Sequence, residues 1–220
     1  MTSANTPSSA SVSAAASVSL VAAPQVTSVM SRPSRSVKQT SSGKARTQRE
    51  YHRAAISGQP DRCLGGYAFY WGHKQECTDT WFGLFLRTGE KTERVDVLTR
   101  LWTGREPKNR SPRIDDIECA FSLRRMGAGE TAVATVRAWD DDGDELRYLW
   151  VVRRESSDKG KGGVSERSPE DVEGAVVADG GARATIRTPD EPGAYRLFVY
   201  VYDGKGAAAT ANMPFLVESD

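Results

Sequence analysis

The sequence predicts a mainly β protein that ends in a two-sheet sandwich of about seven short strands. Three observations support this prediction. Small or apolar residues alternate at a period of two in three stretches, residues 131–139, 145–153 and 194–202. Glycine-containing turns follow the first and the last of these stretches, and Trp150 stands in the middle of the second. A period of two is typical of antiparallel strands that bury one face, so residues 113–220 are expected to form the sandwich.

Composition excludes some classes of function. The chain has 220 residues, a net charge of +1 and 38% hydrophobic residues, which suits a soluble protein of one or two domains. No stretch is long and apolar enough to span a membrane, so no membrane partner is expected. Six basic residues and no acidic one precede Glu50, and the remaining 24 basic and 29 acidic residues give the rest a net charge of −5. A mildly acidic folded part argues against nucleic acid as a partner.

Residues 1–48 are rich in Ser, Ala, Thr and Val without a sustained period, and they are predicted to be a disordered tail. Three interpretations stay open for this tail. It is a featureless or non-native extension, an acid-free organelle transit peptide, or an export signal around the apolar residues 17–23. A short helix is expected to follow over residues 47–55.

Residues 63–85 carry the most distinctive local pattern. The apolar run over residues 64–71 is aromatic and flanked by glycines, which predicts a strand buried on both faces. A polar loop over residues 72–80 follows. In residues 90–102 apolar side chains recur near helical spacing, at Val95, Leu98, Leu101 and Trp102. The pattern therefore predicts one strand-loop-helix unit.

Residues 67–76 (Tyr-Ala-Phe-Tyr-Trp-Gly-His-Lys-Gln-Glu) and 78–85 (Thr-Asp-Thr-Trp-Phe-Gly-Leu-Phe) resemble the last βα unit of the TIM barrel in retaining glycoside hydrolases of the family-two type. The resemblance implies a partial barrel unit over residues 49–103, carbohydrate and the rest of a barrel as partners, and a secreted or periplasmic location. Trp71 falls where those enzymes place the floor of a sugar subsite, because a flat indole stacks on the C–H face of a sugar. The alternative for Trp71 is a buried side chain at a strand end.

Catalytic residues cannot be assigned from this unit. Retaining glycosidases need two carboxylates about 5 Å apart, and the strands that carry them in the family have no counterpart here. Glu76 is a candidate substrate contact, with a solvated loop carboxylate as the alternative. His73 has no partner at ligand spacing, so neither a metal nor a cofactor is expected. Whether the chain is an enzyme stays open. Two functions result: a C-terminal fragment of a carbohydrate-active hydrolase that is not catalytic alone, or a non-enzymatic carbohydrate-binding, adhesion or spacer module.

Residues 104–112, with prolines among charges, predict a linker to the sandwich. Seven short strands with a central Trp are typical of an immunoglobulin-like fold. Residues 139–150 and 192–206 resemble polycystic-kidney-disease-type (PKD) and related cadherin-like bacterial modules, which implies an accessory domain. Such a domain is expected to fold alone over residues 113–220, with Trp150 pointing between the sheets.

Two features of the predicted sandwich could carry chemistry. The acidic run over residues 140–145 is either a Ca²⁺ site or a tight hairpin turn, and the turn explains its glycine and aspartates. The second face of the last long strand either stacks on sugars or docks onto the preceding unit, and it carries Arg196, Phe198, Tyr200 and Tyr202. Residues 159–173 predict a long flexible loop. The cysteines Cys63, Cys77 and Cys119 do not make a disulfide framework.

Overall fold

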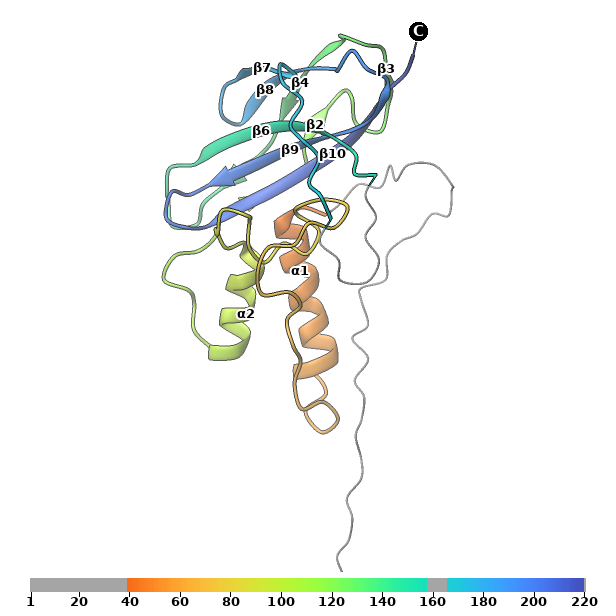
Figure 1. Cartoon of the computed structure of the whole chain (residues 1–220). Coiled ribbons are helices and arrows are strands. Elements are labelled where there is room, and N and C mark those ends of the chain that lie inside the picture. Colours follow the sequence, from red (N-terminus) through yellow and green to blue (C-terminus); the bar gives the residue numbers. More distant parts are fainter. Residues whose placement is uncertain (1–38, 158–165, 220) are drawn as a thin grey trace, which may run out of the picture. The chain divides into compact units, whose positions relative to one another are not determined.

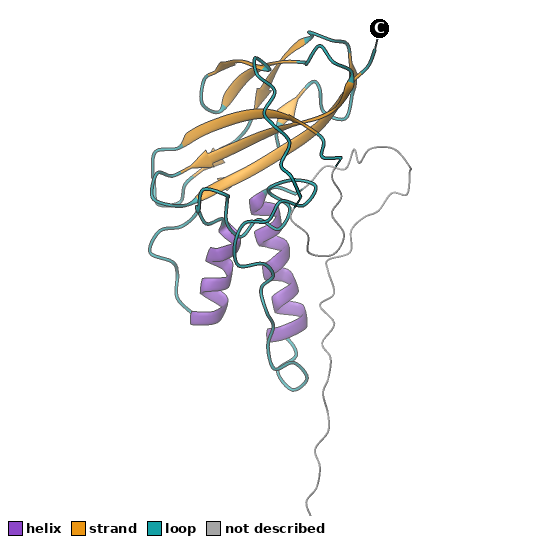
Figure 2. Cartoon of the chain, viewed as in Figure 1, coloured by secondary structure: helices purple, strands orange, loops and turns teal. Residues whose placement is uncertain are grey.

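The computed structural model describes residues 39–157 and 166–219, which belong to one compact unit. Residues 1–38 of the predicted tail and residues 159–165 of the predicted loop over residues 159–173 lie outside the described residues. The described part is mainly β, as predicted, with two helices in its N-terminal part (Figure 2). All three cysteines lie in the described part of the chain, and none of them forms a disulfide.

The first helix, α1, spans Ser41–His52 and continues into a π-helical turn at Arg53–Ser57. It begins at Ser41 because Thr40 is an N-cap, whose hydroxyl accepts a hydrogen bond of 3.0 Å from the amide of Gly43. The expectation of disorder up to residue 48 was therefore wrong for residues 41–48. The hydroxyl of Ser41 accepts a hydrogen bond of 3.0 Å from the amide of Thr210, so the helix is anchored on a strand 169 residues later.

The second helix, α2, spans Glu93–Thr103 and confirms the helix predicted over residues 90–102. It ends at Gly104, whose φ of +67° is the left-handed conformation that glycine adopts without strain. Val95 and Leu98 on its apolar side form a small buried cluster with Leu84. Arg94 on α2 donates a hydrogen bond of 2.6 Å to Gln48 on α1, so the two helices are joined side by side.

The sandwich consists of two four-stranded sheets (Figure 1). One sheet has the order β3-β10-β9-β6, formed by Arg125–Met126, Ala208–Val217, Gly193–Tyr202 and Arg147–Arg154. The other has the order β2-β4-β8-β7, formed by Glu118–Cys119, Thr131–Thr135, Arg183–Arg187 and Val176–Asp179. A short pair of β1 (Arg113–Ile114) and β5 (Ala138–Trp139) lies beside them. All pairs are antiparallel except β3 with β10, which run parallel.

The residues that the alternation predicted to point inward lie in the core between the sheets or pack against it. On β9 the predicted inward residues are at most 1% exposed, and they are Tyr195, Leu197, Val199 and Val201. Trp150 on β6 is 4% exposed in the same cluster, and its indole nitrogen donates a hydrogen bond of 2.9 Å to the carbonyl of Gly181. The inward orientation predicted for Trp150 is thus confirmed.

The predicted strand over residues 64–71 is not formed. These residues are irregular, and the side chains of Leu64 and Tyr67 are 108% and 95% exposed. A strand that buries both faces needs neighbouring strands on both edges, and the described part of the chain contains no barrel strands to provide them. The described residues therefore do not support a partial TIM-barrel unit over residues 49–103.

The acidic run over residues 140–145 does not close a hairpin between neighbouring strands, contrary to one alternative for it. It crosses from β5 to β6, which lies in a different sheet from β4. Residues 203–206 do close the β9-β10 hairpin, as predicted, with Ala208 opposite Tyr202.

Candidate functional site

The outward face of the β3-β10-β9-β6 sheet is covered by residues 39–112 of the same chain, which carry α1 and α2 and which we call the helical part. Phe198 and Tyr200 on β9 are 4% and 5% exposed and pack with Leu86 and Ala208. This face was expected either to stack on sugars or to dock onto the preceding unit, and in the structure it docks onto the preceding unit. No surface for a sugar remains at these rings.

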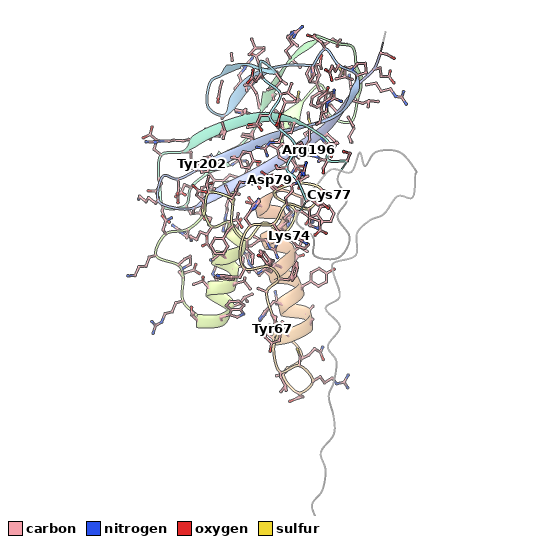
Figure 3. All side chains as sticks on the ribbon, viewed as in Figure 1. Tyr67, Lys74, Cys77, Asp79, Arg196 and Tyr202 are labelled. Atoms are coloured by element: carbon pink, nitrogen blue, oxygen red, sulfur yellow. The ribbon has the colours of Figure 1, made fainter. Side chains whose placement is uncertain are left out.

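A polar network fastens this covered face. Asp79 lies at the face in Figure 3, and its Oδ2 is 2.8 Å from Nη1 of Arg153 on β6. Arg196 is 1% exposed and forms an ion pair of 2.5 Å with Glu155 and a hydrogen bond of 2.6 Å with Asn212. Asp79 could not be identified from the sequence, because a single aspartate in a polar loop gives no signal of a partner on a distant strand.

An exposed aromatic surface lies on the helical part, and one of its residues, Tyr67, lies away from the covered sheet face in Figure 3. We define it by five residues from residues 67–71 and the last turn of α2, each between 45% and 95% exposed: Tyr67, Phe69, Tyr70, Trp71 and Trp102. Single exposed apolar residues are normal, but several large rings together are uncommon in a surface without a partner.

Trp71 and Trp102 form the centre of this aromatic surface. Their ring centroids are 6.0 Å apart, their planes differ by 27°, and they are 57% and 53% exposed. Phe85 meets the Trp71 ring edge-on at 5.3 Å and is itself partly buried against the cluster under α2. Trp71 therefore rests against a partly buried ring, and both indoles remain more than half exposed to solvent.

A second contact holds the neighbouring residues in place. The ring of Phe69 meets that of Phe82 edge-on at 4.9 Å, and the ammonium of Lys74 lies 5.4 Å from the centroid of Phe82. The loop over residues 67–71 is therefore irregular but anchored by its aromatic side chains.

The sequence-predicted site residues are not brought into one sugar subsite. Trp71 does not lie at a strand end, and it contacts Trp102 and Phe85. Glu76 forms an ion pair of 2.7 Å with Lys74, with 35% of its side chain exposed. Trp102 was predicted on the apolar side of its helix, so the sequence did not identify it as the surface partner of Trp71.

His73 is half-buried near Arg87 and Asp79. Burial, followed by the positive charge of Arg87, lowers the pKa of His73, whereas Asp79 raises it. A neutral imidazole is therefore favoured near pH 7. The only group of at least three acidic, His or Cys side chains close enough to share a metal within residues 39–157 and 166–219 lies elsewhere, and it consists of Asp140, Asp144 and Asp203.

No family model matches the chain, and no curated protein matches it. Among solved structures, the PKD1 domain of Vibrio anguillarum Epp has a TM-score of 0.30 and 18% identity, over 51% of this chain and all of that one. A DUF4784 family protein from Bacteroides caccae has a TM-score of 0.27 and 11% identity, over 48% of this chain and 24% of that one.

These likenesses cover about half of the chain and concern the fold alone. The mainly β sandwich is established by the strand order and the core described above. Neither described helix is long and apolar enough to cross a lipid bilayer.

Proposed function

We propose that this chain is a non-enzymatic accessory module that binds carbohydrate through its aromatic surface. The observation that carries the proposal is the pair Trp71 and Trp102, both more than half exposed, with ring centroids 6.0 Å apart and Trp71 packed against the partly buried Phe85. Indole faces attract the C–H groups of pyranose rings, and rigid aromatic side chains lose little conformational entropy on binding.

The sandwich has a supporting role in this proposal. The outward face of the β3-β10-β9-β6 sheet is covered by the helical part, and its inward face forms the core. Neither face of this sheet is open to a ligand, so the sandwich serves to support the helical part and the aromatic surface on it. An accessory module of this kind presents its binding rings on one end and leaves the sandwich free to connect to other domains.

The hydrolase-fragment interpretation is not part of this proposal. It depended on a buried barrel strand ending at Trp71, and residues 64–71 form no strand. We expect the purified chain to have no activity on aryl glycosides. Turnover that is lost in Glu76→Gln would contradict this and would make Glu76 catalytic.

The proposal is tested by affinity electrophoresis in gels that contain soluble polysaccharides, for example xylan, β-glucan, galactomannan and pullulan. Wild-type migration should be retarded by at least one of these polymers, and Trp71→Ala and Trp102→Ala should each restore migration to the polymer-free value. Removing one stacking ring typically costs about 1–3 kcal/mol of binding free energy, or roughly a factor of 5–150 in affinity.

A matched control is Val177→Ala, which removes an exposed apolar side chain (58%) from the sandwich strand β7. It should bind like the wild type. If all three variants were retarded as much as the wild type, the sugar would bind at a site other than the aromatic surface. Absence of retardation on a wide panel, together with pull-down of a protein partner that Trp71→Ala abolishes, would favour the adhesion or spacer alternative.

A further inference from the structure

A small polar cavity lies between the segment before α2 and the strands β6 and β9. The segment contributes Gln75 and Asp79 to its wall, β6 contributes Arg153, and β9 contributes Arg196 and Phe198. Asp79 and Arg196 lie near one another in Figure 3. The cavity has a volume of about 10 Å³, which is room for one molecule of the size of water.

Two residues of the wall have a buried oxygen that needs a donor. Gln75 is 4% exposed, and its Oε1 accepts no hydrogen bond within residues 39–157 and 166–219. Oδ2 of Asp79 accepts from Arg153 and Tyr200, whereas its Oδ1 is buried and accepts from no described residue. Burying an acceptor without a donor is costly, because the oxygen loses its hydration and gains nothing in return.

Charge and chemistry restrict what this cavity can hold. It is lined by three guanidinium groups and two carboxylates, namely Arg153, Arg154, Arg196, Asp79 and Glu155. Because positive groups outnumber negative ones, a cation is repelled. An anion offers acceptors, but the two buried oxygens need donors. A small neutral molecule with two donors satisfies both conditions.

We propose that this cavity binds a single structural water molecule, which donates hydrogen bonds to Oε1 of Gln75 and to Oδ1 of Asp79. Water has two donors, and its own lone pairs accept from the guanidinium groups of the wall. Buried waters in proteins typically make about three such bonds. This site is independent of the aromatic surface and of what that surface binds.

The water also stabilises an unusual turn. Cys77 lies between the two water-binding residues and has a φ of +55°, a conformation that residues with a side chain adopt infrequently. The amide of Cys77 donates a hydrogen bond of 2.6 Å to Oε2 of Glu166. A water that bridges Gln75 and Asp79 holds the turn from both flanks. It thereby keeps the carboxylate of Asp79 directed at the sheet.

Gln75→Met tests the proposal in the full chain, because methionine has a similar length but no amide oxygen. If Oε1 has no partner in solution, the substitution removes a penalty, and Tm should stay the same or rise. If a water is bound, the water loses an acceptor, and Tm should fall by about 3–6 °C. The matched control is Gln59→Met at an exposed turn, which should leave Tm unchanged within about 1 °C.

A crystal structure of the wild-type chain gives a second and independent readout. It should show one electron-density peak at about 2.7–3.2 Å from both Oε1 of Gln75 and Oδ1 of Asp79. The proposal is overturned if ordered waters are seen elsewhere on the protein but no peak lies in this cavity. It is also overturned if the peak gains an anomalous signal after soaking in rubidium chloride, which would identify a monovalent cation, or if Gln75→Met melts at or above the wild-type Tm.

Discussion

The hydroxyl of Tyr200 donates a hydrogen bond of 2.5 Å to Oδ2 of Asp79, a residue 121 positions earlier in the chain. The same oxygen accepts a bond of 2.8 Å from Arg153. One carboxylate in the segment before α2 therefore satisfies a phenol on β9 and a guanidinium on β6. This contact fixes the helical part on the outward sheet face, and with it the position of the aromatic surface.

Asp79→Ala is expected to lower the free energy of unfolding by about 2–4 kcal/mol, because it leaves Tyr200 and the largely buried Arg153 without their shared acceptor. Urea denaturation of the full chain measures this. The matched control is Asp171→Ala, which removes the other carboxylate of Arg153, at 2.6 Å, but from a side chain that is 59% exposed. It should cost at most about 1 kcal/mol. If the two variants lost the same free energy of unfolding, the burial of the Asp79 carboxylate would contribute nothing to stability.

Stability should fall at alkaline pH through Tyr200. Burial, followed by the negative charge of Asp79, raises the pKa of Tyr200 well above its ordinary value of 10.0. The folded state therefore holds the phenolic proton more tightly than the unfolded state does. This contribution is fully present below about pH 10 and is lost as the pH rises further, by up to about 1.4 kcal/mol per pH unit.

Tyr200→Phe isolates this effect. At pH 8 the variant should be less stable than the wild type by about 1–2 kcal/mol, because the hydrogen bond to Asp79 is lost. Between pH 10 and 11.5 the difference should shrink, since phenylalanine has no proton to lose. The other tyrosines with raised pKa values are present in both proteins, so they cancel in the comparison. If the free energies of unfolding of the wild type and of Tyr200→Phe differ by the same amount throughout this pH range, Tyr200 does not ionise on unfolding.

The covered sheet face changes what is expected of the isolated sandwich. Alternation alone predicts that residues 113–220 fold by themselves, but in that fragment Phe198 and Tyr200 would lose their cover. The burial of these two rings is worth about 4 kcal/mol, so the fragment should melt at least about 8 °C below a fragment of residues 39–220. It should also self-associate in size-exclusion chromatography with light scattering. A monomeric fragment 113–220 with an unchanged Tm would contradict this.

The sandwich core could be predicted from sequence because a period of two assigns each side chain to one of two faces. Tyr195 and Val199 were placed inward on that basis alone. The face of Phe198 and Tyr200 could be identified as apolar, and docking onto the preceding unit was among its interpretations. Its partner Asp79 could not be found, since a hydrogen bond across 121 residues leaves no trace in local spacing.

Residues 64–71 show where local pattern was misleading. An apolar, aromatic run between glycines is typical of a buried strand. A strand also needs neighbouring strands to pair with, and the run itself does not show whether the chain provides them. The same rings instead form an exposed surface beside Trp102. Asp203 could not be grouped with Asp140 and Asp144 from the sequence for a related reason, because only the fold brings the β9-β10 turn to the acidic run.

Trp150→Ala should be the most damaging of the tryptophan substitutions. Trp150 is 4% exposed, packs between the two sheets and donates a hydrogen bond to Gly181, so its removal leaves a cavity and an unpaired carbonyl. The expected loss is about 3–5 kcal/mol, a large part of the stability of a single domain. The matched control is Trp102→Ala, which truncates the same side chain at a position that is 53% exposed and should cost at most about 1 kcal/mol. Urea denaturation of both variants in the full chain measures the difference, and a cost for Trp102→Ala as large as that for Trp150→Ala would show that the exposed indole pair is part of a core.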